Sequence, residues 1–361
     1  MDRSLLVAIV VVLAAATSAS RAPAQTAPRP DVPLDSLARS FAEANGLPSL
    51  VLGVSVGGER TVIGVGEVNV ATPDGQTLYE IGSVSKVLTS LALADAVARG
   101  EVTLETPVAD LLPGWTVGAH ADGPIRLVDL ATHTSGLPRL PMNLFATMDG
   151  SDPYAAYTPE LLRAALSGVA PAAAPGTTFE YSNMGGGLLG FALAQRAETT
   201  YGALVAERVL APLGLTETVL DVAPGDTLRF APAHGADGAP VPHWTWTEPT
   251  AGAGAWRSTA GDLLTLAEAV LDPAATPLGD ALALSLQVHG DASRDRKTGL
   301  GWMHGVIHDR PAVWHNGMVG GSAAFVGAVP EAGVAVVVLT NRQVPVDALA
   351  VEALARLVAD R

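Results

Sequence analysis

Residues 81–100 read Ile-Gly-Ser-Val-Ser-Lys-Val-Leu-Thr-Ser-Leu-Ala-Leu-Ala-Asp-Ala-Val-Ala-Arg-Gly, and the rest of the chain is interpreted outward from this stretch. Apolar residues recur at helical spacing from Val84 to Ala94, and Gly100 ends the pattern, which predicts a helix. Ser83 and Lys86 stand one turn apart at its start, so we expect their side chains on one face. The chain contains only two lysines, so the position of one beside a serine is informative.

The pair formed by Ser83 and Lys86 suits nucleophilic catalysis. A serine hydroxyl attacks a carbonyl group when a nearby base takes its proton, and a lysine acts as that base only when burial or a neighbouring cation lowers its pKa. The free N–H groups at the start of the predicted helix also favour negative charge on a reacting oxygen. The alternative is a helix start with a solvent-facing lysine, and a Ser-x-x-Lys match by itself leaves both interpretations open.

Strand and helix patterns divide the chain into three parts. Both ends contain β-branched runs with a helical pattern beside them, whereas alanine and leucine dominate from residue 87 to 286. This arrangement predicts an α+β fold: one antiparallel β-sheet built from the N- and C-terminal segments with flanking helices, plus an inserted mainly helical domain. We expect the sheet domain to comprise 34–82 and 288–361, and the helical domain 83–287. The expected strands are 49–56, 60–65, 301–308, 312–315, 323–329 and 334–339, and the expected terminal helices are 34–45 and 346–358.

The first 24 residues have the pattern of a secretory signal peptide. Arg3 precedes a run of twelve apolar residues from Leu5 to Ala16, and a stretch of small residues ending at Ala24 follows. The run is too short for a transmembrane helix, which needs about 20 apolar residues. We expect cleavage near Ala24, with Ser20 as the alternative, and a flexible segment over 25–33. The mature protein would have no membrane span and would be periplasmic or secreted.

Composition excludes several classes of function. The chain has 21 basic and 36 acidic residues and a formal net charge of −15, so we expect no nucleic-acid partner. Because it has no cysteine, it has no disulfide, no thiolate metal site and no cysteine nucleophile. The sequence implies no metal or other cofactor, and the expected partner is a small-molecule or peptide substrate.

Further motifs follow the serine and lysine in order. Tyr181-Ser182-Asn183 and His315-Asn316-Gly317 come next, and together with Ser83-x-x-Lys86 they resemble the serine penicillin-recognising superfamily. That superfamily includes class C β-lactamases, serine DD-peptidases, D-aminopeptidases and related esterases. The resemblance extends over residues 34–342. Its secondary motifs are LATHTSGLP at 130–138, PGT at 175–177, PLGL at 212–215, RSTAGD at 257–262 and GLGW at 299–302.

The resemblance implies the roles of three catalytic residues. Ser83 would attack a carbonyl group and form an acyl-enzyme. Lys86, with Tyr181 as its partner, would move the proton from the serine to the leaving group. Two nearby cations, Lys86 and a protonated His315, would lower the pKa of Tyr181.

The resemblance also implies a set of substrate-binding residues. Asn183 would bind a substrate amide or hold the lysine, the N–H of Met318 would form an oxyanion hole with that of the nucleophile, and Gly317 would leave room for substrate. β-Lactamases usually have Lys-Thr-Gly where this chain has His315 and Asn316 before the glycine. A neutral imidazole binds a carboxylate less firmly than an ammonium group, and Asn316 replaces the hydroxyl that would bind the same carboxylate.

Other motif matches are better explained by structure. Lys297-Thr298-Gly299 is a literal Lys-Thr-Gly, but it follows a polar run over 293–296 that indicates an exposed loop. Ser55 lies in a Gly-x-Ser-x-Gly pattern, yet a second strand follows where a nucleophile elbow requires a helix. His304 and His308 lie on a predicted strand, so we do not expect a zinc site there.

These observations predict an exported serine hydrolase of the β-lactamase and penicillin-binding-protein type. It would act through a Ser83 acyl-enzyme on a D-amino-acid peptide or a β-lactam amide. A carboxylesterase of the same fold is the alternative, because it uses the same attack and the same oxyanion hole. A non-catalytic penicillin-binding sensor is less favoured, because a pure binder has no need of a lysine-activated serine.

Overall fold

The computed structural model describes residues 33–148, 150–359 and 361. The expected signal peptide, and the expected flexible segment apart from Pro33, lie outside the described residues. Within these ranges every helix is too short or too polar to span a membrane. The helices are α1 (Leu34–Ala44), α2 (Ser85–Ala98), α3 (Leu127–Ala131), α4 (Pro159–Gly168), α5 (Asn183–Arg196), α6 (Tyr201–Val205), α7 (Ala211–Leu213), α8 (Glu248–Ala251), α9 (Ala260–Leu271), α10 (Gly279–Ser285) and α11 (Asp347–Ala359). The strands are β1 (Ser49–Val56), β2 (Glu59–Gly66), β3 (Tyr79–Glu80), β4 (Arg257–Ser258), β5 (Gly290–Ser293), β6 (Arg296–Thr298), β7 (Met303–Ile307), β8 (Arg310–Met318), β9 (Ala323–Val329) and β10 (Val334–Thr340).

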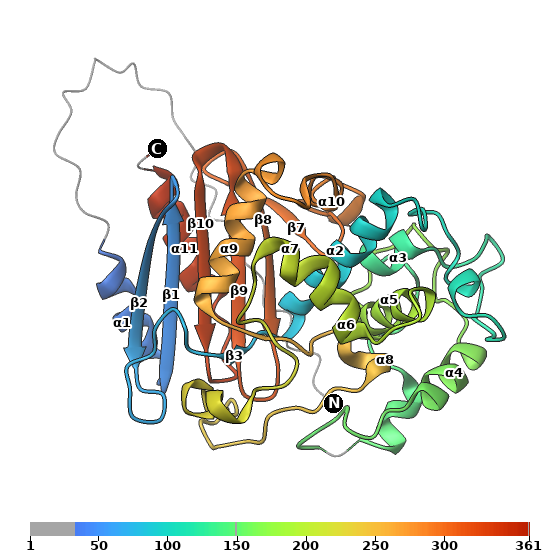
Figure 1. Ribbon diagram of the computed structural model, residues 1–361, viewed down its shortest axis with the longest axis horizontal. Helices are drawn as coiled ribbons and strands as arrows, with labels where there is room; N and C mark the ends of the chain where they lie inside the picture. Colours follow the sequence, from blue (N-terminus) through green and yellow to red (C-terminus); the bar gives the residue numbers. More distant parts are fainter. Residues whose placement is uncertain (1–32, 149, 360) are drawn as a thin grey trace.

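Eight strands form one antiparallel sheet in the order β2-β1-β10-β9-β8-β7-β6-β5 (Figure 1). The N-terminal strand β1 pairs with β10 in a register that places Leu50 opposite Thr340. Both strands are buried along nearly their whole length, which accounts for their runs of valine and leucine. The sheet is therefore built from the two ends of the chain, and the expected α+β fold is confirmed.

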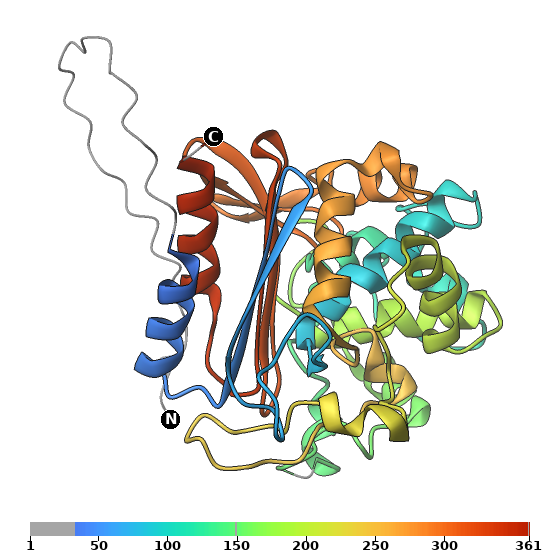
Figure 2. The ribbon, with the colours of Figure 1, turned by 60° about the vertical axis from the view of Figure 1, so that its left-hand side comes forward.

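Helices cover both faces of this sheet. Helices α1 and α11 lie on one face, and α9 lies on the other against β1, β9 and β10 (Figure 2). Neighbouring residues of a strand point to opposite faces, so Leu50 and Leu52 pack with Leu349 of α11 whereas Val51 packs with Leu264 of α9. Helix α9 belongs to the segment 83–287, so this segment also contributes to the cover of the sheet.

The chain between β2 and β5 packs largely around α2 (Figure 1). Twelve of the fourteen residues of α2 are buried, and the helix contacts α5 and α10. Glycines in α5 allow side chains of α2 and α6 to approach its backbone closely. A Cβ on Gly186 would lie 2.9 Å from Cε of Lys86, and a Cβ on Gly190 would lie 2.8 Å from the ring of Tyr201. This close packing brings the start of α5 against Lys86.

One segment at the edge of the sheet differs from its prediction. The polar run over 293–296 is not a plain exposed loop, because β5 and β6 form a hairpin whose turn lies between Ser293 and Arg296. Lys297 lies on β6, where it is exposed and forms an ion pair with Asp291. Charged side chains are common on an edge strand, and this composition hides the strand from a search for apolar alternation.

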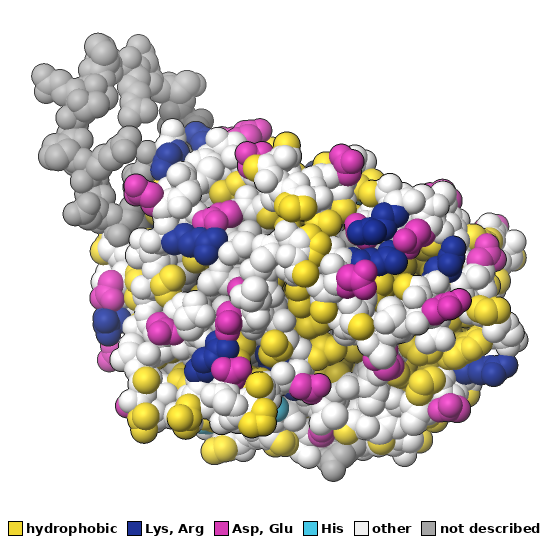
Figure 3. All heavy atoms as spheres, viewed as in Figure 1, with side chains coloured by type: hydrophobic (Ala, Val, Ile, Leu, Met, Phe, Trp, Pro, Cys, Tyr) yellow, Lys and Arg dark blue, Asp and Glu magenta, His cyan; other side chains and the backbone are white. Residues whose placement is uncertain are grey.

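Charged side chains are dispersed over the face of the molecule shown in Figure 3. Acidic and basic groups lie among one another, and hydrophobic side chains gather toward the middle of the face. This face therefore has no continuous basic surface of the kind that binds a phosphate backbone.

Candidate active site

Ser83 lies in a 3₁₀ turn, η1 (Gly82–Val84), that leads directly into α2. Gly82 has a φ of 50°, and a Cβ there would lie 2.8 Å from the backbone nitrogen of Met318, so glycine is required. The backbone N–H of Trp256 donates to Ser85 Oγ at 3.1 Å and fixes the turn from behind. The Ser83 side chain is half-buried, so solvent and substrate can reach it.

Lys86 is buried, with 3% of its surface exposed, and its Nζ contacts three oxygen atoms. They are Ser83 Oγ at 3.1 Å, Asn183 Oδ1 at 2.8 Å and the carbonyl oxygen of Ala253 at 2.7 Å. Burial lowers the pKa of Lys86 well below its usual value, and the positive charge of Arg139 lowers it further. A neutral amine has two N–H groups and one lone pair. In that form the two carbonyl oxygens, which can only accept, would take both N–H groups and leave the lone pair facing the Ser83 hydroxyl.

Tyr181 lies just before α5 with its ring against Lys86. Lys86 Nζ is 4.9 Å from the ring centre, and the guanidinium group of Arg139 is 5.1 Å from it. Burial raises the pKa of Tyr181 to about 12, although a hydrogen bond with Ser83 and the charge of Arg139 act in the opposite direction. The predicted lowering of this pKa is therefore wrong, because the effect of burial outweighs that of the neighbouring positive charge. Tyr181 is a neutral phenol at neutral pH.

Asn183 is the first residue of α5 and is oriented by the turn before it. The Ser182 side chain caps the helix, and the backbone N–H of Asn183 donates to the carbonyl of Arg139 at 2.9 Å. The side-chain oxygen of Asn183 binds Lys86, while its amide nitrogen lies 3.5 Å from the hydroxyl of Tyr154. Of the two expected roles, this geometry favours holding the lysine.

The end of strand β8 brings Gly317 and Met318 beside Ser83. A Cβ on Gly317 would lie 2.8 Å from the backbone nitrogen of Ser83, so the strand passes directly against the turn that holds this serine. The N–H groups of Ser83 and Met318 therefore belong to two backbones in contact. Two such donors near one attacking oxygen are the requirement for an oxyanion hole.

His315 lies on the same strand and is buried. Burial lowers the pKa of His315 to about 3, with a further contribution from Lys86, so the imidazole is neutral at neutral pH. Its Nδ1 lies 2.6 Å from the carbonyl of Asn316 and so holds the proton. His315 therefore does not provide the second positive charge considered for the neighbourhood of Tyr181. The side chain of Asn316 points to the opposite face of the sheet, where its amide donates to Asp347 at 2.8 Å, so it does not replace the hydroxyl of Lys-Thr-Gly.

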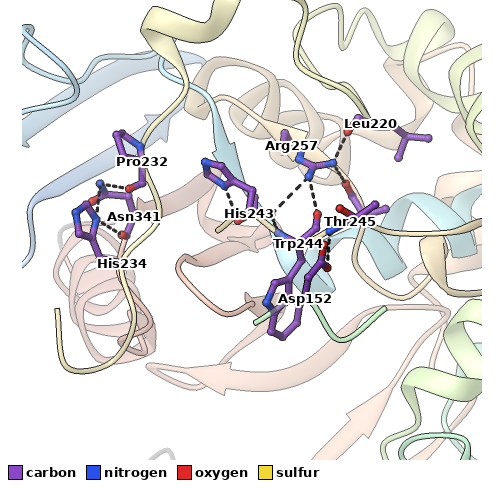
Figure 4. Close-up of polar contacts among 11 residues, drawn as sticks. Asp152, Leu220, Pro232, His234, His243, Trp244, Thr245, Arg257 and Asn341 are labelled. Atoms are coloured by element: carbon purple, nitrogen blue, oxygen red, sulfur yellow. Dashed lines mark hydrogen bonds and ion pairs between the residues drawn. The ribbon is translucent and has the colours of Figure 1, made fainter. Parts of the chain in front are cut away.

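A loop that includes Trp244 packs closely against the residues just after β8. A Cβ added to Gly320 would lie only 2.5 Å from the indole nitrogen of Trp244. Buried Glu80, three residues before the nucleophile, accepts the backbone N–H of Trp244 at 3.2 Å and lies 2.9 Å from His243 Nδ1. Arg257 donates to the carbonyl of Trp244 at 2.8 Å (Figure 4). The two contacts of Glu80 join residues more than 160 positions apart, so no local motif in the sequence indicates them.

Residues that match the other motifs have structural roles. Ser55 lies buried in β1 and donates to Glu268 at 2.7 Å, and Lys297 lies at the exposed sheet edge. His133 accepts the backbone N–H of Ser182 at 3.2 Å and holds the turn before α5. In the part of the chain that the structure describes, no group of three or more His, Asp or Glu side chains is arranged to hold a metal ion.

A serine beside a buried lysine whose pKa is lowered, with a neutral phenol and two neighbouring N–H groups, is an arrangement that suits a serine hydrolase. The Beta-lactamase family model matches residues 34–360. The chain therefore belongs to the beta-lactamase family, and its resemblance to the serine penicillin-recognising superfamily is confirmed.

Individual relatives agree with this assignment. Penicillin-binding protein 4 of Amycolatopsis lactamdurans is 29% identical over 320 residues, which cover 82% of this chain and 81% of that protein. D-alanyl-D-alanine-carboxypeptidase/endopeptidase AmpH of Escherichia coli (strain K12) is 31% identical over 278 residues, covering 73% of this chain and 68% of that protein. The structure of a class C beta-lactamase superposes with a TM-score of 0.80 at 20% identity and covers 90% of this chain and 94% of that chain.

Proposed function

We propose that this protein hydrolyses D-amino-acid peptides or β-lactam amides through an acyl-enzyme on Ser83. The observation that supports this most is the 3.1 Å separation of Lys86 Nζ and Ser83 Oγ, with two carbonyl oxygens bound to the same nitrogen, so that a neutral lysine would direct its lone pair at the hydroxyl. A lone pair directed at the hydroxyl is what general-base activation of a serine needs. The printed names of two relatives, a penicillin-binding protein and a D-alanyl-D-alanine carboxypeptidase, favour this substrate class.

In the proposed reaction Ser83 Oγ forms a bond to the substrate carbonyl carbon while Lys86 takes the hydroxyl proton. The π electrons of the carbonyl move to its oxygen, which the N–H groups of Ser83 and Met318 stabilise. When the carbon–nitrogen bond breaks, the proton passes from Lys86 to the leaving nitrogen, with the neutral hydroxyl of Tyr181 as relay. Water then attacks the acyl-enzyme by the same route, which releases the acid and restores Ser83.

A carboxylesterase is the second candidate function. The same attack cleaves an ester, and the neutral His315 favours this alternative because an uncharged imidazole binds a substrate carboxylate weakly. The loops around the site decide between an ester and an amide substrate, because the catalytic group is common to both.

Labelling with a fluorescent penicillin tests the nucleophile. We expect a covalent adduct that mass spectrometry locates on Ser83 and that Ser83→Ala abolishes. Ser55→Ala is the matched control, because Ser55 has the other serine-hydrolase pattern but lies in the sheet, and this variant should still be labelled. An adduct that survives in Ser83→Ala would exclude the assignment.

A panel of three substrates tests the reaction class. We expect hydrolysis of a D-Ala-D-Ala peptide or of nitrocefin by the wild type and none by Ser83→Ala. Turnover of p-nitrophenyl acetate alone would favour the carboxylesterase, and covalent labelling without turnover of any substrate would favour a penicillin-binding sensor.

We also propose that the protein is exported, with the signal peptide at residues 1–24. The apolar run after Arg3 supports this proposal. N-terminal sequencing of the mature protein should begin at Gln25, and recovery of the chain from the cytoplasm with its original N-terminus would contradict it.

A further inference from the structure

Arg139 is fixed beside the catalytic group by its own backbone. Its carbonyl oxygen accepts the N–H of Asn183 at 2.9 Å and that of Met184 at 3.2 Å. These are the first residues of α5, whose start also provides the amide that binds Lys86. The position of Arg139 is therefore tied to that of the catalytic residues, although the loop itself has no regular secondary structure.

The side chain of Arg139 has unused hydrogen-bond donors at the site. It is exposed, and its guanidinium group lies 5.1 Å from the centre of the Tyr181 ring. Within residues 33–148, 150–359 and 361, no hydrogen bond or ion pair joins this guanidinium group to another residue. Arg126, by contrast, binds the carboxylates of Glu105 and Asp129. A guanidinium group has five N–H donors and keeps its charge at any physiological pH, so Arg139 can receive an anion.

Arg139 places its guanidinium group beside a lysine and a histidine that burial drives toward their neutral forms. Burial lowers the pKa of Lys86 well below its usual value and the pKa of His315 to about 3. The charge of Arg139 lowers the pKa of both Lys86 and Tyr181. This electrostatic influence means that the guanidinium group is close enough to act on a substrate held between Ser83 and Tyr181.

An apolar pocket begins at the next residue of the loop. Leu140 and Pro141 line it together with Tyr154, Asn183 and Met184, and none of the residues that line this pocket is charged. Its free space is only about that of one water molecule, so it does not hold a substrate group in this conformation. The loop of Arg139 is therefore closely packed on its apolar side, and its charged side chain is left on the exposed side.

We propose that Arg139 binds a carboxylate of the substrate and thereby selects anionic substrates over neutral ones. The inference rests on the proposed function. β-Lactamases usually have a lysine where this chain has His315, and Arg139 would provide the positive charge that this histidine lacks. A charge-assisted contact of this kind favours the bound state by roughly 10- to 100-fold. A guanidinium group that only tuned the pKa of Lys86 would change the turnover of anionic and neutral substrates equally.

Two matched pairs of substrates test the proposal. The first pair is 4-nitrophenyl hydrogen glutarate and 4-nitrophenyl pentanoate, which differ by a carboxylate on the acyl side. The second pair is benzoylglycyl thioglycolate and its methyl ester, which differ by a carboxylate on the leaving group. We expect kcat/KM to favour the anionic member of at least one pair by about tenfold or more, and added salt to reduce the preference. The pair that shows this preference tells whether Arg139 binds a carboxylate on the acyl side of the substrate or on its leaving group.

Arg139→Gln should remove this preference, chiefly through a higher KM for the anionic member, and Arg139→Lys should keep part of it. The matched control is Arg196→Gln, which removes the same charge from the last residue of α5, about 20 Å along the helix, and should keep the preference. Equal kcat/KM within both pairs for the wild type, or a preference that survives in Arg139→Gln, would overturn the proposal. The proposed function fails separately, if Ser83→Ala still hydrolyses these substrates.

Discussion

The burial of His315 makes a quantitative prediction about the pH dependence of stability. Its pKa is about 3 in the folded protein and near 6.5 in an unfolded chain. Between these values the unfolded state binds a proton that the folded state does not, so the free energy of unfolding falls as the pH falls from 6.5 toward 3. pH 4 lies about 2.5 units below the pKa of the histidine in the unfolded chain, and each unit corresponds to about 1.4 kcal/mol. His315 therefore removes about 3 kcal/mol of stability between pH 7 and pH 4.

The variant His315→Asn tests this value. Its amide can still donate to the carbonyl of Asn316, as His315 Nδ1 does, but it does not titrate. Urea unfolding at pH 7 and pH 4 should show that the free energy of unfolding falls by about 3 kcal/mol more in the wild type than in the variant. The carboxylates that titrate in this range are the same in both proteins, so their contribution cancels. Equal losses within about 1 kcal/mol, or an NMR titration of the His315 ring with a pKa near 6.5, would refute the reasoning.

Three further predictions concern the groups around the nucleophile. Lys86→Ala should lower kcat by about 10² to 10⁴. In the wild type, kcat/KM should rise with pH through an inflection well below the usual lysine pKa. A profile of kcat/KM that is flat from about pH 5 to 9 would contradict a lysine base. Gly186→Ala should slow penicillin labelling of Ser83 by about tenfold or more, because the new Cβ would lie 2.9 Å from Cε of Lys86. Gly168→Ala, where a Cβ meets nothing within 4 Å, is its control and should be labelled like the wild type. Glu80→Gln should lower the free energy of unfolding by about 1 to 3 kcal/mol, because it weakens the contacts of the buried carboxylate with His243 and Trp244. A urea unfolding curve that is unchanged in this variant would show that these contacts do not stabilise the fold.

Local spacing predicts the parts of this protein that depend on neighbouring residues. The strands at Ser49–Val56 and Ala323–Val329 have the expected bounds, because unbroken apolar runs between turn residues suit a strand buried on both faces. The adjacency of Ser83 and Lys86 follows in the same way from one turn of helix. The edge hairpin at 290–298 was missed because its residues are charged, and an edge strand needs no apolar face.

Properties set by distant residues could not be predicted in this way. The charge on His315 depends on burial by segments far away in the chain, and burial is a property of the assembled fold. Arg139 follows the LATHTSGLP motif directly, but its position beside Tyr181 depends on how its loop folds. The signal available in the sequence was an arginine immediately after a recognised motif.

The pairing of β1 with β10 has a consequence for the order in which this protein matures. Strand β1 can pair with β2 as soon as that strand is made, but its second neighbour, β10, is complete only when the chain has grown to Thr340, long after Ser83. Met318, whose N–H group is the second donor in the proposed reaction, is also made late. On the proposed function, Ser83 would therefore stay unreactive in a nascent chain until residues 318–340 are made and the long-range pairing forms.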